Sequence, residues 1–203
     1  MRLLPLLAAA VLTAASTLHA GTAAYRNSIL ADSPIAYWEM DEAAGTATAA
    51  DSAGTPQAGA YQNVVLGPAS AFSNLKSCGQ FNGSTSRVQV AADAAFNLGT
   101  GDFTVETWAK TLVSTRGDVF NYKNSTDFGI FLNNSAAGSI ETYLNGFLPG
   151  FTTTAGAWNH IVLTRGSGTA RLYVNGVERG SAPGRKGVTT KPVSQKSTRQ
   201  IKK

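Results

Sequence analysis

The sequence predicts an all-β protein, an antiparallel two-sheet sandwich or jelly roll. Three observations support this. Short segments that alternate polar and apolar residues recur along the chain, Gly and Asn mark the turns between them, and no helical pattern separates them. The chain is also rich in Gly, Ala, Ser and Thr, and only 14% of its residues are charged. This composition suits many short strands and argues against a helical bundle.

The first predicted elements lie between residues 25 and 59. Residues 25–34 (YRNSILADSP) allow a short helix, which Pro34 would end because the residue before a proline avoids helical geometry. Residues 35–42 (IAYWEMDE) are expected to form a strand. Residues 43–59 contain three glycines and a proline, and they are expected to form a loop.

The clearest strand patterns follow. They lie at residues 86–90, 103–110, 158–165 and 170–175. In 103–110 (FTVETWAK), Phe103, Val105 and Thr107 fall on one face, and Thr104, Glu106 and Trp108 fall on the other. A Gly-Ser-Gly turn between the last two segments predicts a β-hairpin, and Asn175-Gly176 predicts a tight turn after it.

The chain begins with the features of a signal peptide. Met1-Arg2 precedes LLPLLAAAVLTAA, an apolar run too short to cross a bilayer. Small residues allow cleavage after Ala20 or Ala24, and Ala24 fits the cleavage rule better. We therefore expect a signal peptide at 1–24, no membrane span, and a secreted, periplasmic or cell-surface protein.

The final residues, 185–203, differ in composition from the rest. They carry seven basic and no acidic residues, contain no aromatic residue, and are expected to be a disordered basic tail after a domain at 25–184. Without this tail and Arg2, nine basic residues face 12 acidic ones, a net charge of −3. The overall charge of +5 therefore belongs to the tail and does not indicate binding to nucleic acid.

Cys78 is the only cysteine, which excludes an intrachain disulfide and a cysteine-based metal cluster. A reactive thiol is one interpretation of a single cysteine in an exported protein. A small buried residue beside a strand is the favoured one.

Four blocks resemble a known family. In order, these are PIAYWEMDEAAGTATAADSAG, QFNGSTSRVQV, DFTVETWAK and WNHIVLTRGSGTARLYVNGVERG, which span residues 34–180. Together they resemble bacterial laminin-G-like domains, also called concanavalin A-like lectin/glucanase jelly rolls. The resemblance implies a concanavalin A-like two-sheet fold, which hosts lectins, enzymes and adhesion modules alike.

The resemblance stops near Gly184. Family members continue with a closing strand that returns beside the first strand, and the basic tail stands in its place here. Either a neighbouring chain or segment supplies that strand, or the copy is truncated or frame-shifted. The second interpretation is favoured because the composition changes abruptly where the strand is due.

The stretch YWEMDE at residues 37–42 raises the question of catalysis. Laminarinase-type glycoside hydrolases on this fold carry a strand of the form E-I-D-x-x-E. Glu39 and Asp41 share a face in a strand, but the third carboxylate should stand at 43 or 44, and both are alanine. We expect Glu39 and Asp41 to form salt bridges or a solvated face, and we assign no catalytic residue.

Binding residues can still be proposed. Trp38, Trp108, Phe147 and Phe151 are candidate ligand contacts, although core packing is the favoured interpretation of the tryptophans. The resemblance also implies a site for one structural Ca²⁺, with Asp51 as its first candidate ligand and Asp41 as its second. For Asp51, an Asx turn is the favoured alternative.

These observations predict an exported, non-catalytic recognition module. Its expected partner is a polysaccharide or a cell-surface glycan or protein. The alternatives are a relic of a glycoside hydrolase on the same fold and a truncated structural fragment of a larger surface protein.

Overall fold

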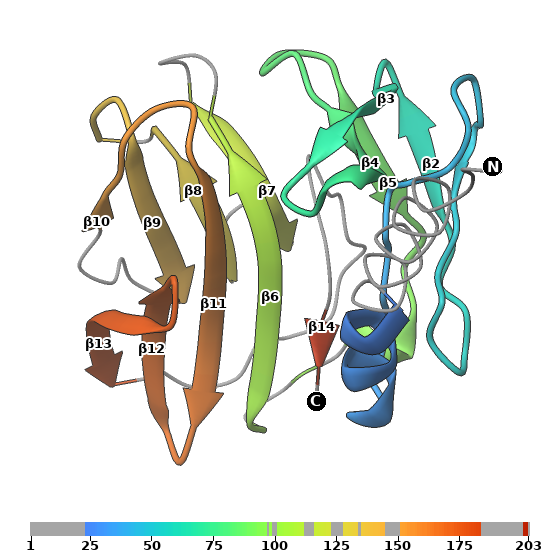
Figure 1. Ribbon diagram of the computed structural model, residues 1–203. Coiled ribbons are helices and arrows are strands. Elements are labelled where there is room, and N and C mark those ends of the chain that lie inside the picture. Colours follow the sequence, from blue (N-terminus) through green and yellow to red (C-terminus); the bar gives the residue numbers. More distant parts are fainter. Residues whose placement is uncertain are drawn as a thin grey trace, which may run out of the picture.

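The computed structural model describes residues 23–96, 98, 101–111, 116–122, 128–133, 135–144, 151–183 and 201–202. Two antiparallel sheets form one part of the molecule (Figure 1). A five-stranded sheet has the order β13-β12-β11-β6-β14, and a four-stranded sheet has the order β10-β9-β8-β7. Their strands are β6 (Phe103–Lys110), β7 (Gly117–Tyr122), β8 (Phe128–Leu132), β9 (Ser139–Leu144), β10 (Phe151–Thr152), β11 (Trp158–Gly166), β12 (Thr169–Val174), β13 (Val177–Pro183) and β14 (Ile201–Lys202).

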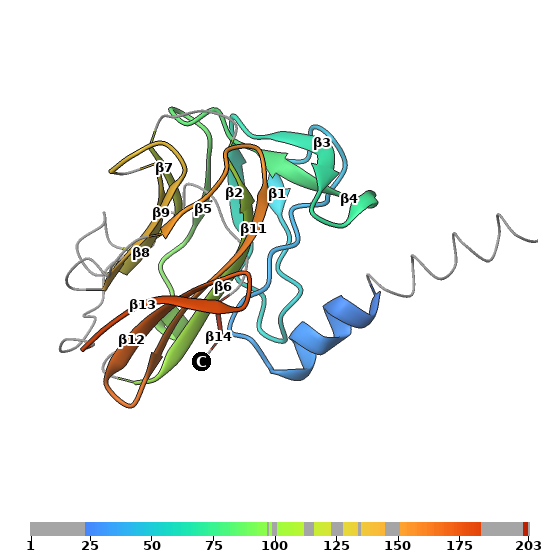
Figure 2. The same ribbon diagram turned by 60° about the vertical axis from the view of Figure 1, so that its left-hand side comes forward.

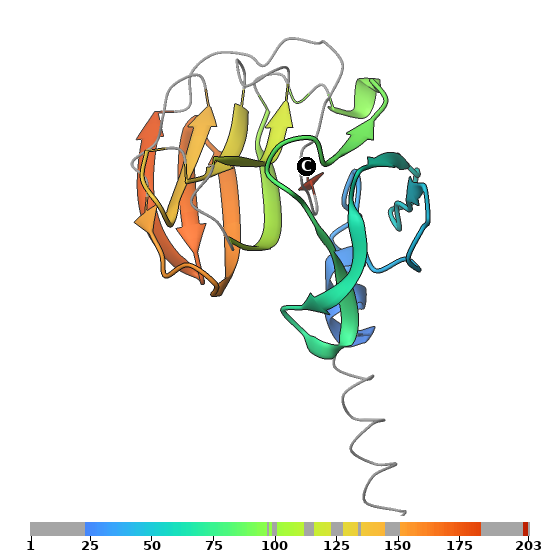
Figure 3. The same ribbon diagram turned by 90° about the horizontal axis from the view of Figure 1, so that it is seen from above.

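The N-terminal part stands beside these two sheets, as the view from above shows (Figure 3). It begins with the expected helix, which covers residues 23–31. The strands β1, β2 and β5 form a three-stranded sheet, and β3 and β4 form a separate hairpin. Their bounds are β1 (Thr48–Ala49), β2 (Gly59–Gln62), β3 (Val65–Ser70), β4 (Ser73–Gln80) and β5 (Arg87–Val90), and a short 3-10 helix covers Ala94–Phe96.

The pairing of β6 with β11 lies at the centre of the five-stranded sheet. It runs without a break through eight residue pairs, from Trp158 opposite Lys110 to Arg165 opposite Phe103. Along β11, buried and half-buried residues alternate over all nine positions. The inward side chains, such as Val105, Ile161 and Leu163, join the core between the sheets. The all-β fold and the alternation predicted for these strands are therefore confirmed.

The turn between β12 and β13 follows the predicted Asn-Gly pair. Asn175 and Gly176 have φ angles of 53° and 78°, which Asn and Gly adopt at low cost. The Asn175 side chain also accepts a hydrogen bond from the His160 backbone N–H at 2.9 Å. This bond joins the turn to the neighbouring strand β11.

The strand predicted at residues 35–42 is wrong. Residues 35–42 form no continuous strand: Ala36 and Trp38 each make a single bridge, that of Trp38 with Asp51, and Met40 has a φ of 56°, outside the range of strands. The reason is that side chains replace the expected ladder. The Asp51 carboxylate accepts the Tyr37 N–H at 2.7 Å, and the Glu42 carboxylate accepts the Ala50 N–H at 2.7 Å.

The core also holds Trp38, one of the four predicted ligand contacts. Its side chain is fully buried, stacks on Phe96 with ring centroids 6.3 Å apart, and donates its indole N–H to the Gln57 carbonyl at 2.8 Å. The favoured interpretation of this tryptophan, core packing, is confirmed. Cys78 is likewise buried, as expected.

Most of the two predicted end segments lies outside the described residues. Of the predicted signal peptide, only residues 23 and 24 are described, and they belong to the first helix. Of the predicted tail, only Ile201–Lys202 is described, as β14. The division into signal peptide, domain and tail therefore stays a prediction. Within the described part of the chain, no helix is both long and apolar enough to cross a membrane.

Replacing Trp38 tests this account of the core. We expect Trp38→Ala to lower the free energy of unfolding by about 3–5 kcal/mol, because a large buried ring and its hydrogen bond are lost. Val65→Ala, at a side chain that is 60% exposed, should change it by less than about 0.5 kcal/mol. Urea unfolding of both variants measures the difference, and equal stabilities would contradict the buried position of Trp38.

Candidate functional site

The carboxylates of YWEMDE form a salt-bridge network, as expected from the sequence. Lys76 reaches both Glu39 and Asp41, and its Nζ lies 2.8 Å from Asp41 Oδ2. Arg26, on the first helix, lies 2.8 Å from Glu39 Oε1. Glu39 and Asp41 therefore point to the same side, where both pair with Lys76. The ion pair of Glu39 with Arg26 connects the first helix to this segment.

The network shifts the ionisation of its members. Burial alone would raise the pKa of Glu39, but hydrogen bonds from Lys76 and Arg26 outweigh it and lower the pKa below its ordinary value of 4.5. Burial would lower the pKa of Lys76, but hydrogen bonds to Asp41 and Glu39 raise it above 10.5. A lowered pKa means that the Glu39 interactions stabilise the fold above pH 4.5 and are lost as the pH falls through the lowered value.

Glu39→Gln tests this linkage. Wild type should exceed the variant in unfolding free energy by a constant amount at pH 6–8, and the difference should shrink as the pH falls below 4.5. Glu178→Gln is the matched control, because Glu178 lies 3.7 Å from Arg171 in an exposed pair that should contribute little. Chemical denaturation at several pH values measures both, and a difference that does not change with pH would contradict the assigned pKa shift.

The two remaining acidic residues of this region, Glu42 and Asp51, accept hydrogen bonds from backbone N–H groups. Asp51 accepts three backbone N–H groups, from Tyr37, Ala53 and Gln57, which is the Asx-type turn expected for it. Among the described residues, no group of three His, Cys, Asp or Glu side chains is placed to hold a metal ion. Both carboxylates have partners within the chain, Asp51 the Tyr37 N–H and Asp41 the Lys76 ammonium. The calcium site at Asp51 and Asp41 stays a prediction.

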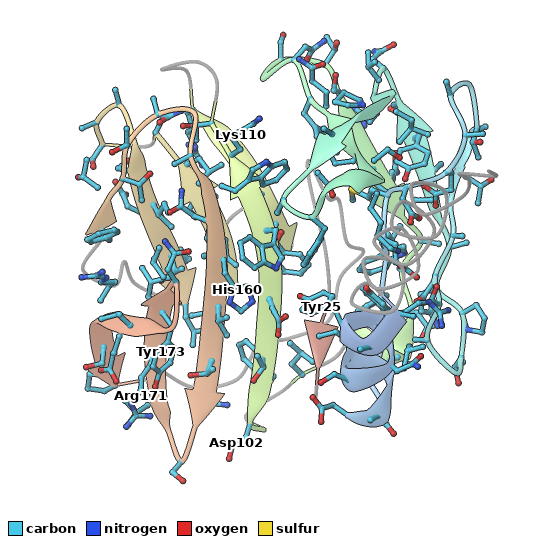
Figure 4. The ribbon with its side chains drawn as sticks, in the orientation of Figure 1. Tyr25, Asp102, Lys110, His160, Arg171 and Tyr173 are labelled. Carbon is cyan, nitrogen blue, oxygen red and sulfur yellow. The ribbon has the colours of Figure 1, made fainter. Side chains whose placement is uncertain are left out.

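A second cluster lies on the side of the five-stranded sheet that faces away from the core, which we call the outer face. Successive residues of a strand point to opposite sides of the sheet, so every second side chain of β6, β11 and β12 lies on the outer face. Figure 4 shows Lys110, His160, Arg171 and Tyr173 on this face. Its side chains are Thr104, Glu106, Trp108, Lys110, Trp158, His160, Val162, Thr164, Thr169, Arg171 and Tyr173.

One half of the outer face is covered by the N-terminal part. Trp108 stacks on His160 with ring centroids 5.0 Å apart. Phe72, from the turn between β3 and β4, forms a T-shaped contact with Trp108, with ring centroids 5.6 Å apart. Tyr25 of the first helix contacts Phe72 at 4.8 Å and accepts the Trp108 indole N–H at 3.2 Å. Trp108 therefore lies where the sequence placed a ligand contact, but rings of the same chain surround it.

Glu106 lies at the centre of this covered half and is only 9% exposed. Its Oε1 accepts the Tyr25 hydroxyl at 3.1 Å and lies 3.2 Å from His160 Nε2. A retaining glycosidase needs a second carboxyl group about 5–5.5 Å away. Across the sheet, Glu106 is opposite Val162, Val162 is opposite Tyr173, and Tyr173 is opposite Glu178. The Glu178 carboxylate therefore lies three strand spacings, about 14 Å, from Glu106.

The other half of the outer face carries the side chains best suited to a ligand. The Lys110 ammonium lies over the Trp158 ring, 5.2 Å from its centroid. Tyr173 pairs across the sheet with Val162, four residues and about 13 Å along β11 from Trp158. Arg171, two residues from Tyr173 on the same face, lies 3.7 Å from Glu178. This half therefore combines two amphipathic aromatic rings with two cations.

The structure does not bring the four predicted ligand contacts together. Trp38 lies in the core, Trp108 lies on the covered half of the outer face, and Phe147 lies outside the described residues. Phe151 belongs to β10 in the other sheet, packs partly against the core, and has the Arg179 guanidinium 4.0 Å above its ring. Trp158, Tyr173 and Lys110 were not predicted as ligand contacts; the register between β11 and β12 places the first two on one face.

Comparisons with known proteins agree with this fold. The laminin G family model described as "Concanavalin A-like lectin/glucanases superfamily" matches residues 82–198, more than half of the chain. A solved structure of an HCR/D mutant is similar with a TM-score of 0.50 and 16% sequence identity over 84% of this chain. That structure is longer, and the match spans 43% of its length.

A second solved structure is domain 4 of AbnA, a GH43 extracellular arabinanase from Geobacillus stearothermophilus, in complex with arabinotriose. It matches with a TM-score of 0.44 and 16% identity over 82% of this chain and 77% of that domain. No curated protein matches. By the family match, the chain belongs to the concanavalin A-like lectin/glucanase superfamily.

Proposed function

We propose that this protein is an exported, non-catalytic module that binds a polysaccharide on the outer face of the five-stranded sheet. The observation that carries the proposal is the pair of half-buried rings, Trp158 and Tyr173, on the part of that face where Lys110 and Arg171 also lie. Its location outside the cytoplasm rests on the signal-peptide pattern of residues 1–24.

The chemistry of these side chains fits a sugar chain. Aromatic rings offer an apolar surface to the C–H faces of sugar rings, and the tyrosine hydroxyl and indole N–H add hydrogen bonds at their edges. Lys110 and Arg171 supply further donors, and Thr164 supplies a hydroxyl that donates and accepts. A flat sheet face can bind an internal stretch of a long polymer, because it has no end walls that would demand a chain terminus.

Catalysis is not proposed, for two reasons that concern the carboxylates. Glu39 and Asp41 are held in ion pairs with Lys76 and Arg26. Glu106 is held by Tyr25 and His160 on the covered half of the outer face. Neither set places two carboxyl groups across an open groove, which glycoside hydrolysis requires.

Trp158→Ala tests the proposed face. After wild type is screened against insoluble and soluble cell-wall polysaccharides, the variant should bind the best of them at least about tenfold more weakly, because it loses one of the two aromatic rings of the proposed contact. Tyr173→Phe should keep most of the binding and Tyr173→Ala should lose it. Calorimetric titration of the soluble polysaccharide measures these affinities.

Val177→Ala is the matched control, because Val177 is half-exposed on β13 and does not belong to the outer-face set. Its affinity should equal that of wild type, and circular dichroism should show that every variant is folded. A wild-type protein that retains no polysaccharide, or a Trp158→Ala variant that binds as well as wild type, would contradict the proposal.

A further inference from the structure

We propose that Arg165 binds a small oxyanion, a carboxylate, sulfate or phosphate group, at one end of the core between the two sheets. The observation is a buried guanidinium without a counterion. Arg165 is only 7% exposed, and no carboxylate of the described residues forms an ion pair with it. Its Nε–H is buried and has no hydrogen-bond partner in the described part of the chain.

The strand pattern of β11 directs Arg165 toward the core. Buried residues alternate along this strand, and Arg165 falls on the same side as Leu163, which belongs to the core. In the register Arg165 lies between Phe103 of β6 and Ala170 of β12, and Ala182 of β13 lies opposite Ala170. None of these three neighbours has a polar side chain. The sheet itself therefore offers the guanidinium no counterion.

The hydrogen bonds of Arg165 use only one part of its guanidinium. Nη1 donates to the Gly101 carbonyl at 2.9 Å. Nε–H and the neighbouring N–H of Nη2 point to the same side of the planar group, and they donate to no described residue. Two such parallel N–H groups fit two oxygens of one carboxylate, sulfate or phosphate. Arg165 therefore has the donor geometry of an oxyanion site.

The acidic residues of the chain explain why the anion must come from elsewhere. The chain has 12 of them, and all except Asp127 lie in the described part. Asp102 is the one closest to Arg165 in the strand register, but it is exposed and accepts the Ser167 N–H at 3.0 Å. Solvent screens such an exposed charge. By contrast, the more exposed Lys76 pairs with two carboxylates.

An uncompensated charge in this position is unfavourable. Burial of a cation costs free energy unless it is both paired and hydrogen-bonded. A water molecule would satisfy the Nε–H of Arg165, but it would leave the positive charge without a counterion. A bound oxyanion satisfies both requirements at once.

The site lies close to solvent although the guanidinium is buried. Figures 1 and 2 show the turn between β11 and β12 at the same end of the five-stranded sheet as the start of β6. Ser167 and Gly168 in this turn are exposed, and Arg165 is only two residues from Ser167. Arg165 points away from the outer face, so the oxyanion site is separate from the polysaccharide contact proposed above.

An anion titration of the full chain tests the proposal. Acetate, sulfate and phosphate are the probes, and each is compared with chloride at equal ionic strength. NMR of arginine side chains follows the Nε–H resonance of Arg165, which is identified by its loss in Arg165→Lys. We expect this resonance to shift in a saturable way with at least one oxyanion, whereas that of Arg87, a half-buried residue of β5, should stay in place. The titration also gives the dissociation constant.

Thermal unfolding supplies a second measurement. At about ten times its dissociation constant, the oxyanion should raise the Tm of wild type by about 3–5 °C relative to chloride, because it binds the folded state. Arg165→Met should lose this rise. Arg165→Lys keeps the charge but loses the paired N–H groups, so it should bind the oxyanion at least about tenfold more weakly. Arg87→Met is the matched control and should respond as wild type does.

Three results would overturn the proposal. The first is an Arg165 resonance that does not shift with any oxyanion, and the second is an equal shift with chloride. The third is an equal rise in Tm for wild type and Arg165→Met, which would show a general effect of salt on the fold. If the Arg165 variants do not fold, the NMR titration of wild type decides, with the resonance assigned through the backbone of Arg165. Polysaccharide binding is measured on the outer face, so failure of one proposal does not imply failure of the other.

Discussion

The register between β6 and β11 is the constraint on which the rest of the structure depends. Eight consecutive pairs fix which side chains of both strands face the core and which face outward. Inward, this register buries Val105, Ile161 and Leu163 between the two sheets. Outward, it places His160 beside Trp108 and Trp158 beside Lys110. Because the side-chain period of a strand is two, a slip of one residue would exchange the core-facing and outward-facing side chains.

The outer face also shows how the N-terminal part is attached. Tyr25 and Glu106 stand 81 residues apart in the sequence and meet through a hydrogen bond across the edge of β6. The salt bridges of Lys76 and Arg26 with Glu39 hold the first helix to the segment that follows it. Stacking of Trp38 on Phe96 then links this part to the common core. Covering one half of the outer face therefore contributes to folding, and the other half is the part proposed for polysaccharide binding.

Local patterns in the sequence were enough to predict the all-β fold, the hairpins and the faces of β6. They failed at residues 35–42, because the strand expected there depends on a partner strand, whereas Asp51 and Glu42 bind the backbone with their side chains. Local patterns also could not tell core aromatic residues from those on the outer face. Trp38 and Trp108 look alike in the sequence, and only tertiary packing places one in the core and the other under Phe72. Trp158 and Tyr173 share a face only because β11 and β12 pair in one particular register.

Chemical-shift mapping of isotope-labelled protein with a soluble oligosaccharide is the most direct test of this account. The sugar should be a fragment of the polysaccharide that the protein retains best. The account predicts that the resonances of Trp158, Tyr173 and Arg171 move together during the titration, while those of the inward residues Ile161 and Leu172 stay in place. Shift changes confined to the four-stranded sheet, for example at Ser139 and Tyr143, would contradict the assignment of recognition to the outer face of the five-stranded sheet.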